Sequence, residues 1–350
     1  MVDTIVVGLG LAGIAMCEEL RAQSEFFVVF NDGSQTASKT AGGLMNPVIL
    51  KRFNLAWKAN EHLPFAKEFY EHLQRYLGVD FFSDLTLLRK FATIEEQNRW
   101  FQAADKPKLA PYLWPGVHAN KNVNVTAPLG FGEVLQACHV HTGVMLQHYE
   151  RDLRVKGQLR ESTFEYDALV LEKDHVVYQG LKAKRIIFTD GFGLKKNPLF
   201  NYLPLEGSKG EYLIIRCEDL QETSVIKSSL FLIPMGNDLY KVGANYNRWD
   251  KTNVPTLEAK ALLEAQLRRM INCSYTIIDH VAGVRPTVQD RRPLVGQHPD
   301  HPQVGLLNGL GSHGITIGPW AAKQLYAAMT GTRYLPPEID IERYRDRRKN

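Results

Sequence analysis

The chain has 350 residues, of which 44% are hydrophobic and 23% charged, and its formal net charge is +4 (42 − 38). This length can hold two domains, and the composition is that of an ordinary globular protein rather than of a disordered or fibrous one. No apolar run approaches the ~20 residues that a membrane-spanning helix needs. No basic segment precedes the apolar start of the chain, so we do not expect a signal peptide.

The four cysteines are spread along the chain and form no C-x-x-C pair. This spacing favours reduced, mostly buried thiols in a cytoplasmic protein. The sequence has no H-E-x-x-H motif and no cluster of metal ligands, and we expect no metal. Residues 341–350 form a basic tail, in which five Lys or Arg against two acids give a charge of +3 (5 − 2). We expect this tail to be solvated, with contact to nucleic acid or a membrane as the alternative.

The most informative pattern lies at the N-terminus. An apolar strand precedes a G-x-G-x-x-G turn formed by Gly8, Gly10 and Gly13, and a helical stretch and a second apolar strand follow it. This order predicts a dinucleotide-binding βαβ unit. Gly8 permits the tight turn, Gly10 leaves room for a pyrophosphate, and Gly13 allows close packing of helix and strand. The phosphates would bind N–H groups at the helix start, where Leu11 and Ala12 lie.

An acidic residue that binds the adenosine ribose is expected about 20 residues after the glycines. By this spacing the position falls on Asn31, with Asp32 next to it. Either side chain can bond a ribose hydroxyl. Because an acid at this place would repel a 2′-phosphate, NADP is disfavoured.

Apolar periodicity along the rest of the chain predicts helices that alternate with short strands. Helices are expected at 63–76, 145–155, 257–271 and 319–329, the last with Pro319 in its first turn. Strands are expected at 85–91, 131–141, 159–164, 169–171, 176–178, 185–189, 211–216, 230–233, 239–244 and 305–308. A loop of small residues is expected at 34–48.

Three further segments belong with the glycine turn. They are the loop SKTAGGLMNP at 38–47, an apolar strand that ends in Thr-Asp-Gly at 186–191, and the pair GVRPT…DRRPLVG and NGLGSHGIT within 283–316. In order and spacing the four segments resemble the FAD-dependent D-amino acid oxidase superfamily. That superfamily includes glycine oxidase, sarcosine oxidase and the oxidase domain of the bifunctional tRNA wobble-uridine modification enzyme.

The resemblance implies an α/β fold with a Rossmann-like FAD-binding domain, made of a central parallel sheet and a small β-meander. An interleaved α+β substrate domain on a mostly antiparallel sheet completes the fold. We expect residues 1–57, 144–205 and 281–340 in the first domain and 58–143 and 206–280 in the second. The cofactor would be FAD, held non-covalently because no cysteine lies in the C-terminal signature.

The resemblance also implies which residues line the cofactor. Besides the glycine turn and Asn31 or Asp32, they are Ser38, Lys39, Thr40, Gly42, Gly43, Leu44, Phe164, Thr189, Asp190, Gly191, Arg285, Gly309, Gly311, Ser312, His313, Gly314, Ile315 and Thr316. Phe164 would contact adenine through its backbone. Sarcosine oxidase has a lysine where this chain has Thr316, so backbone donors or His313 would carry more of the electrostatic stabilisation of a reduced flavin.

For substrate, the resemblance points to Arg285, since the family uses an arginine before this proline to bind the substrate carboxylate. A guanidinium can bind a carboxylate through two hydrogen bonds. The alternative is an ion pair with Asp290 or Asp279. His313 is a second candidate catalytic residue, with a loop histidine bonded to backbone as its alternative.

A tyrosine of the substrate domain is the third candidate. Tyr212, Tyr240 and Tyr246 are expected on its sheet, and one of them would orient the carboxylate or the amine. We select Tyr246 for this role. The alternative for each is packing within the sheet, where aromatic residues are common.

The resemblance implies an FAD-dependent oxidase or dehydrogenase of amines or amino acids. Hydride would leave the C–H next to the nitrogen of a small carboxylated amine for flavin N5, and the imine would hydrolyse. One alternative is an oxidase acting on a carboxymethylaminomethyl wobble uridine of tRNA, which requires a basic groove around the site. The other is a flavoprotein without turnover, such as an electron-transfer subunit.

Overall fold

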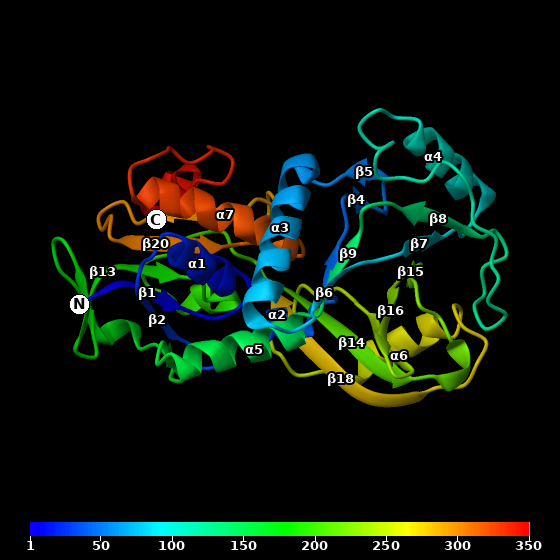
Figure 1. The fold of residues 1–350 in the computed structure, drawn as a ribbon, viewed down its shortest axis with the longest axis horizontal. Coiled ribbons are helices and arrows are strands. Elements are labelled where there is room, and N and C mark those ends of the chain that lie inside the picture. Colours follow the sequence, from blue (N-terminus) through cyan, green and yellow to red (C-terminus); the bar gives the residue numbers. More distant parts are fainter. Residues whose placement is uncertain (350) are drawn as a thin grey trace.

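The computed structural model describes residues 1–349, which form two lobes side by side along the long axis of the molecule (Figure 1). One lobe contains the N-terminal glycine turn and both chain ends. The other contains most of residues 80–140 and 205–280. The long helix α3 (Ala59–Leu77) lies between them.

The first lobe is built on an eight-stranded sheet with parallel strands at its centre. Parallel pairing joins β10 (Leu159–Arg160), β2 (Phe27–Phe30), β1 (Val2–Val7), β13 (Leu181–Phe188) and β20 (Val304–Asn308), in this order. An antiparallel meander of β13, β12 (Val176–Tyr178) and β11 (Leu169–Leu171) extends the sheet, and β19 (Leu294–Gln297) pairs with β20. The central strands are buried along nearly their whole length, as apolar parallel strands are.

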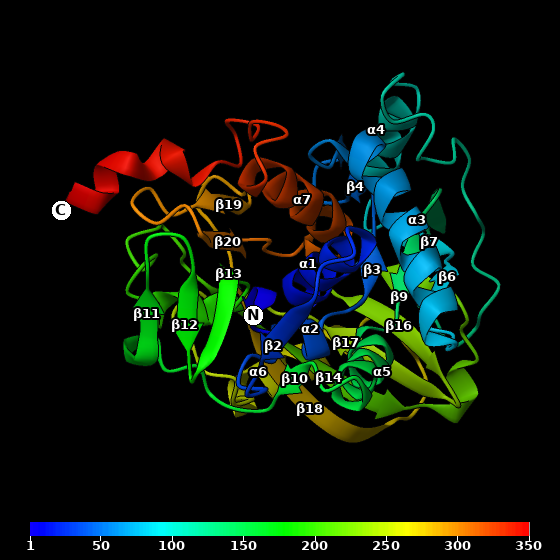
Figure 2. The same cartoon turned by 60° about the vertical axis from the view of Figure 1, so that its left-hand side comes forward.

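The helices beside this sheet include α1 (Leu11–Ala22) from the first part of the sequence and α7 (Gly314–Met329) from the last part. These two helices lie against one another, and α3 packs on α7 (Figure 2). α5 (Thr142–Val155) contacts α3 and the short α2 (Ala37–Thr40). The first and last thirds of the chain therefore share one helical layer.

The second lobe is built on a seven-stranded sheet in the order β18 (Thr276–Arg285), β14 (Ser208–Arg216), β17 (Leu239–Gly243), β16 (Phe231–Gly236), β15 (Val225–Lys227), β7 (Leu87–Lys90), β8 (Phe131–Val134). All neighbours are antiparallel except β15 and β7. Helix α6 (Leu257–Leu267) packs on β14 and β17, and α4 (Ile94–Ala104) lies near β8.

Short elements complete the structure. One small sheet contains β3 (Leu44–Met45), β9 (Cys138–Val140) and β6 (Phe82–Asp84), in this order. A second small sheet contains β4 (Val48–Ile49) and β5 (Asn54–Leu55). The 3₁₀ segments are η1 (Tyr166–Ala168), η2 (Gly191–Lys196), η3 (Glu218–Leu220) and η4 (Ile341–Lys349). Within residues 1–349, no helix is both long enough and apolar enough to span a bilayer.

The predicted fold class is confirmed, with a central parallel sheet, a meander and a separate, mostly antiparallel sheet. We propose that the two sheets mark two domains. The expected boundary between residues 280 and 281 falls inside β18, so we place it at the end of that strand.

Helix α7 begins at Gly314, five residues before the predicted start at Pro319. Inside a helix a proline cannot donate to the carbonyl four residues earlier, here that of Ile315. The buried hydroxyl of Tyr70 on α3 donates to this carbonyl instead, at 3.0 Å. A hydrogen bond from another helix thus accommodates the proline, and no local pattern indicates it.

The prediction of a solvated tail was wrong for residues 341–344, which are buried or half-buried, whereas residues 345–348 are exposed. Ile341 is 1% exposed, and Arg343 donates from Nε to Asp290 at 3.1 Å and from Nη2 to the Pro293 carbonyl at 2.9 Å. The hydroxyl of Tyr344 donates to the same carboxylate at 2.7 Å. The tail therefore docks on the loop that follows β18. Asn350 lies outside the described residues.

Other differences are local. The strand predicted at 159–164 is limited to β10, the helix predicted at 257–271 ends at Leu267, and the loop at 34–48 contains α2, β3 and β4. Neither α4 nor β18 was predicted.

Candidate active site

A cavity of about 1250 Å³ is lined by residues of both lobes. It is larger than the ~300–1,000 Å³ of a typical small-ligand pocket. A recess of about 290 Å³ adjoins it near the end of β2. The two together offer room for a dinucleotide and a second molecule.

The N-terminal glycine turn forms one wall of this cavity. Gly8 has a φ of +94°, and a Cβ there would lie 2.8 Å from the carbonyl oxygen of Thr189. A Cβ on Gly13 would lie 2.3 Å from the Gly8 carbonyl oxygen, so Gly13 faces the turn and does not line the cavity. Gly10 does line it, at the start of α1, where the N-cap residue supplies no side-chain acceptor and the first turn has no acid. An open helix N-terminus of this kind suits a pyrophosphate.

Three predicted cofactor residues also hold this turn in place. Thr189 donates from Oγ1 to the Val7 and Gly8 carbonyls at 2.9 and 2.7 Å. The N–H of Leu9 donates to Asn31 at 3.2 Å, and the N–H of Leu11 donates to Ser38 at 3.0 Å. Their side chains therefore shape the cavity whether or not a ligand touches them.

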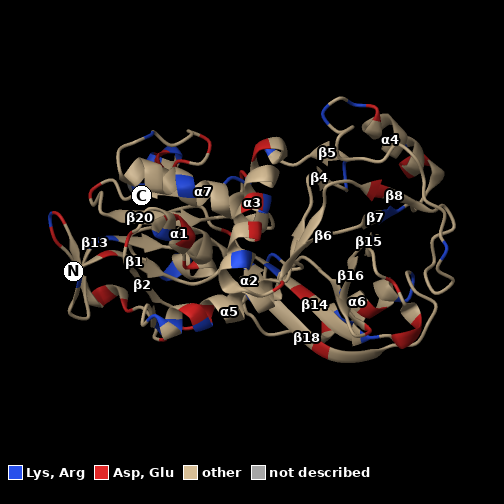
Figure 3. Ribbon diagram, in the orientation of Figure 1, with Lys and Arg blue, Asp and Glu red and all other residues tan. Residues whose placement is uncertain are grey.

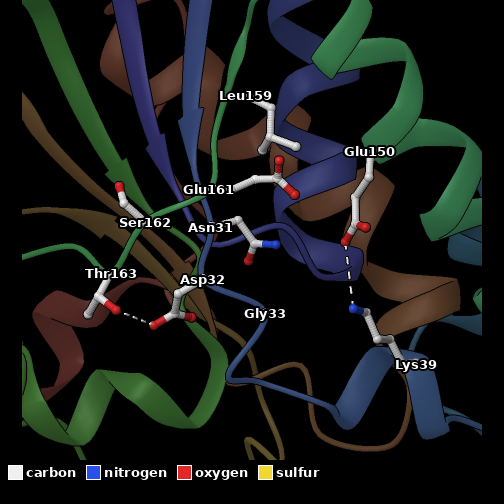
Figure 4. A pocket seen from close by; sticks show the side chains of 9 residues that line it. All are labelled: Asn31, Asp32, Gly33, Lys39, Glu150, Leu159, Glu161, Ser162 and Thr163. Atoms are coloured by element: carbon white, nitrogen blue, oxygen red, sulfur yellow. Dashed lines mark hydrogen bonds and ion pairs between the residues drawn. The ribbon is translucent and has the colours of Figure 1, made fainter.

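Figure 4 shows the polar recess beyond the turn. Asp32 accepts from Thr163 at 3.1 Å and from the Ser34 N–H at 2.9 Å. Burial would raise the pKa of Asp32, but these hydrogen bonds outweigh it and lower the pKa. Lys39 and Glu150 approach to 3.8 Å across the mouth of the recess. An ionised carboxylate at this position favours a ribose with free hydroxyls.

Asp190 connects the ends of β13 and β20. It accepts from Asn308 at 2.9 Å and from Tyr166 at 3.2 Å, and burial raises its pKa to about 6. Phe164 is 7% exposed and stacks on Tyr178 with ring centres 4.1 Å apart. Both Asp190 and Phe164 line the cavity.

The C-terminal glycine loop forms the opposite wall. Gly309 and Gly311 have φ values of +68° and +57°, and the N–H of Gly311 donates to the Pro286 carbonyl at 2.9 Å. His313 opens onto the cavity at the start of α7, and burial, with the nearby charge of Arg291, lowers its pKa. A Cβ on Gly314 would lie 3.4 Å from Leu11, so the open ends of α1 and α7 are neighbours. Together they make this part of the cavity electropositive.

The loop at residues 41–43 is held from behind by the second lobe. Lys241 donates to the Ala41 carbonyl at 2.8 Å, and the ring of His139 lies 3.2 Å from the Gly42 carbonyl. Burial lowers the pKa of Lys241 to about 8 and that of His139 to about 4. Neither residue lines the cavity, and both support its wall from behind.

Arg285, the last residue of β18, lies in the cavity without an acidic partner among the described residues. Its Nη1 is buried and has no hydrogen-bond partner. The guanidinium carbon lies 4.7 Å from the ring centre of Tyr246. Neither Asp290 nor Asp279 pairs with it, because Asp290 binds the tail and Asp279 bonds the backbone of His280. A guanidinium that lines a cavity and has no acidic partner is ready to bind an anion.

Gly210 makes room for this guanidinium. A Cβ at Gly210 would lie 1.9 Å from Nη2 of Arg285. The flanking residues Lys209 and Glu211 point to the other side of β14, where both are fully buried. There Lys209 pairs with Asp250, and His280 lies 3.1 Å from Glu211. Lys209 and Glu211 are therefore structural residues of β14, and Gly210 between them also shapes the cavity.

The three candidate tyrosines differ in position. Tyr212 lies on β14 and lines the cavity, where burial raises its pKa. Tyr240 is in the core and accepts from the Glu222 N–H at 3.0 Å, so it is not a site residue. Tyr246 lines the cavity but follows the end of β17, so its predicted place on the sheet was wrong. It lies in a loop and is 72% exposed.

With the exception of Gly13 and the candidate Tyr240, every residue that the sequence analysis proposed for the site lines the cavity. Several basic residues that the sequence analysis did not assign to the site also line the cavity. They are Lys51, Lys195, Lys196, Lys227, Arg248, Lys251, Arg291 and Arg292. Within residues 1–349 none of these eight lies within ion-pair distance of a carboxylate. Over the whole molecule, by contrast, acidic and basic residues are mixed on both lobes (Figure 3). The charge at the cavity is thus local.

The geometry can be compared with known proteins. A family described as FAD dependent oxidoreductase matches residues 3–328. The chain belongs to this family. The predictions of the superfamily, of FAD as cofactor and of an oxidoreductase are thereby confirmed, and the protein is an FAD-dependent enzyme.

Individual relatives are more distant. Glycine oxidase of Pseudomonas putida is 24% identical over 98% of this chain and 97% of its own. The tRNA 5-methylaminomethyl-2-thiouridine biosynthesis bifunctional protein MnmC of Legionella pneumophila is 31% identical, over 35% of this chain and 19% of that protein.

Solved structures show the same fold. Glycine oxidase from Geobacillus kaustophilus has a TM-score of 0.80 at 16% identity, covering 98% of this chain and 97% of that one. Iminodiacetate oxidase from Chelativorans sp. BNC1 has a TM-score of 0.77 at 18% identity, with 98% of both chains covered. The geometry of the cavity also fits FAD independently of these comparisons. The N-termini of α1 and α7 face it, the glycine turn leaves room for a pyrophosphate, and the recess beside Asp32 suits a ribose.

Proposed function

We propose that the enzyme removes hydride from the C–H next to the nitrogen of a small carboxylated amine or amino acid. The observation that carries this proposal is the guanidinium of Arg285, which lines the cavity and has no acidic partner among the described residues. A carboxylate would satisfy that group and neutralise its charge. The names of glycine oxidase and iminodiacetate oxidase support the same class of substrate.

In this proposal each residue has a limited task. Arg285 binds the carboxylate, and the ring of Tyr246 holds the guanidinium in place through a cation–π contact of 4.7 Å. Tyr212 lies on the same sheet as Arg285 and next to Gly42, and its side chain completes this wall of the cavity. His313 is neutral near pH 7 because its pKa is lowered, so it can exchange a hydrogen bond without adding charge. FAD, when bound, supplies the hydride acceptor.

The proposal includes two further properties, the attachment of FAD and the location of the protein in the cell. FAD would be held non-covalently, since no cysteine is among the residues that line the cavity in residues 1–349. A cytoplasmic location is supported by four cysteines without a disulfide.

Anaerobic bleaching of the flavin tests the proposal. We expect glycine, sarcosine, another amino acid or an N-carboxymethyl amine to bleach the wild-type enzyme. Arg285→Ala should raise KM for that compound by about 10²–10³-fold, because a charge-assisted pair is lost. Arg151→Ala, at an exposed arginine on α5, is the matched control. Unchanged kinetics in Arg285→Ala would refute the role of Arg285.

A second candidate is oxidation of a carboxymethylaminomethyl group on tRNA. It is favoured by the unpaired cations at the cavity and by Trp249, which is 92% exposed between Arg248 and Lys251. Cations with an exposed aromatic ring suit a nucleic acid strand. The partial match to MnmC proteins agrees with this candidate.

Modified tRNA distinguishes the two candidates. Bleaching by tRNA alone, lost in Arg248→Ala and weakened by salt, would establish the second candidate. Bleaching by free carboxylated amines with the same rate in Arg248→Ala would establish the first.

A further inference from the structure

Two of the four cysteines, distant in sequence, are in contact. Cys217 follows the end of β14, and Cys273 lies in the connection between α6 and β18. Their Sγ atoms are 3.2 Å apart, and Sγ of Cys217 also lies 3.1 Å from the Ser274 carbonyl. Both are free thiols. Sequence spacing gave no sign of this pair.

The backbones on both sides of the pair are held independently. The N–H of Cys217 donates to the Asp238 carbonyl at 2.9 Å. Asn272, next to Cys273, donates its N–H to the Asn124 carbonyl at 2.9 Å and accepts from Thr126 at 2.8 Å. The thiols are therefore brought together by the fold rather than by loose side chains.

The two thiols differ in access to solvent. Cys217 is 1% exposed, whereas Cys273 is partly exposed. Burial, together with the neighbouring Cys273, raises the pKa of Cys217 to about 12. An oxidant dissolved in water would therefore meet Cys273 first, as reactive cysteines are the accessible ones.

We propose that Cys217 and Cys273 form an oxidation site that takes hydrogen peroxide and closes to an intramolecular disulfide. The Cys273 thiolate attacks one peroxide oxygen, the O–O bond breaks, and water leaves after protonation, which gives a sulfenic acid. The Cys217 sulfur, losing its proton, then attacks the Cys273 sulfur and expels the oxygen as a second water. In sum, two thiols and one peroxide give one disulfide and two waters.

The position of this bond connects it with the active site. Cys217 and Cys273 lie just beyond the Arg216–Thr276 pair, at the far end of the β14–β18 ladder. The near end of the same ladder pairs Ser208 with Arg285. Dioxygen that takes two electrons and two protons from a reduced flavin leaves as hydrogen peroxide, so an enzyme of this class can release the proposed oxidant. The bond would stabilise the lobe that carries one wall of the cavity.

The test uses the full-length holoenzyme, treated with one to ten equivalents of hydrogen peroxide and compared with the reduced enzyme. We expect the number of titratable thiols under denaturing conditions to fall from four to two. The intact mass should fall by about 2 Da, for two hydrogens, and dithiothreitol should reverse the change. The melting temperature should rise by about 3–8 °C.

Variants separate this result from other oxidations. Cys17→Ser, at a buried cysteine outside the pair, should still lose two thiols. Cys273→Ser should lose no titratable thiol and should gain no oxygen. Cys217→Ser should take up oxygen or form a cross-linked dimer. Peptide mapping must show the 217–273 cross-link in the wild type. Retention of all four thiols, a mass gain in whole oxygens, or a cross-link between two chains in the wild type would overturn the proposal.

Discussion

Substitution of Gly210 by alanine tests the position of Arg285 without removing its charge. A Cβ at Gly210 would lie 1.9 Å from Nη2 and 2.3 Å from Nη1 and Cζ of Arg285. Such contacts essentially never fall below 3.0 Å, so the guanidinium must move by at least 1.1 Å (3.0 − 1.9). The backbone at Gly210 has no positive φ, and the substitution therefore strains only the arginine side chain.

The expected loss follows from the bonds that a displaced guanidinium cannot make. A hydrogen bond to a charged group contributes about 1.5–3 kcal/mol, which corresponds to a fall in kcat/KM of about 10- to 150-fold. Most of this change should appear in KM, because binding of the carboxylate is weakened before any chemistry occurs. Stability should change little, since an arginine side chain is flexible and alanine reduces the entropy of the unfolded chain.

The assay compares kcat and KM for a carboxylated amine with those for its ethyl ester. In Gly210→Ala the preference for the free carboxylate should fall by the same factor as kcat/KM. Gly193→Ala is the matched control, because this glycine also lines the cavity and its Cβ would meet the nearest atom at an ordinary 3.6 Å. Wild-type KM and ester discrimination in Gly210→Ala would refute the proposed role of Arg285.

Three further predictions concern the framework of the site. Tyr70→Phe should lower the free energy of unfolding by about 1–3 kcal/mol in urea titrations, because the buried Ile315 carbonyl loses its donor; a smaller change would mean that water replaces it. Arg343→Ala should lower the melting temperature and raise KM, since the loop after β18 loses its contact with the tail, whereas Arg333→Ala, at an exposed arginine, should do neither. Lys241 has a pKa of about 8, below its ordinary 10.5, so the folded state releases this proton first. The contribution of Lys241 to stability should therefore rise from about pH 8 to pH 10.5, and in a series of thermal melts the wild type should gain stability relative to Lys241→Met over this range.

The parts of the fold that were predictable are those with local signals. The glycine turn, the periodicity of α3 with its glycine stop, and the apolar run of β13 each specify an element within a few residues. The start of α7 was not predictable, because a hydroxyl on α3 replaces the missing N–H of Pro319. The docking of Arg343 on Asp290 joins residues 53 apart, and no pattern of either segment indicates it.

The candidate site shows the same division. Resemblance placed Arg285 in the cavity, but its freedom from Asp290 depends on the tail, which occupies that carboxylate. Tyr246 reaches the guanidinium from a loop that follows β17, so the expectation that it lies on the sheet was wrong. The basic residues around the opening come from separate loops and strands, and only the folded chain brings them to one cavity.

The neighbouring open ends of α1 and α7 have a consequence for biosynthesis. Helix α1 begins at Leu11 and α7 at Gly314, and β1 pairs with β13, whose residues follow 181 positions later (183 − 2). A nascent chain therefore lacks the cavity wall formed by α7 until residues 314–329 have been synthesised. Complete enclosure of the flavin must wait for these residues, and fragments that end before Gly314 should hold FAD weakly or not at all.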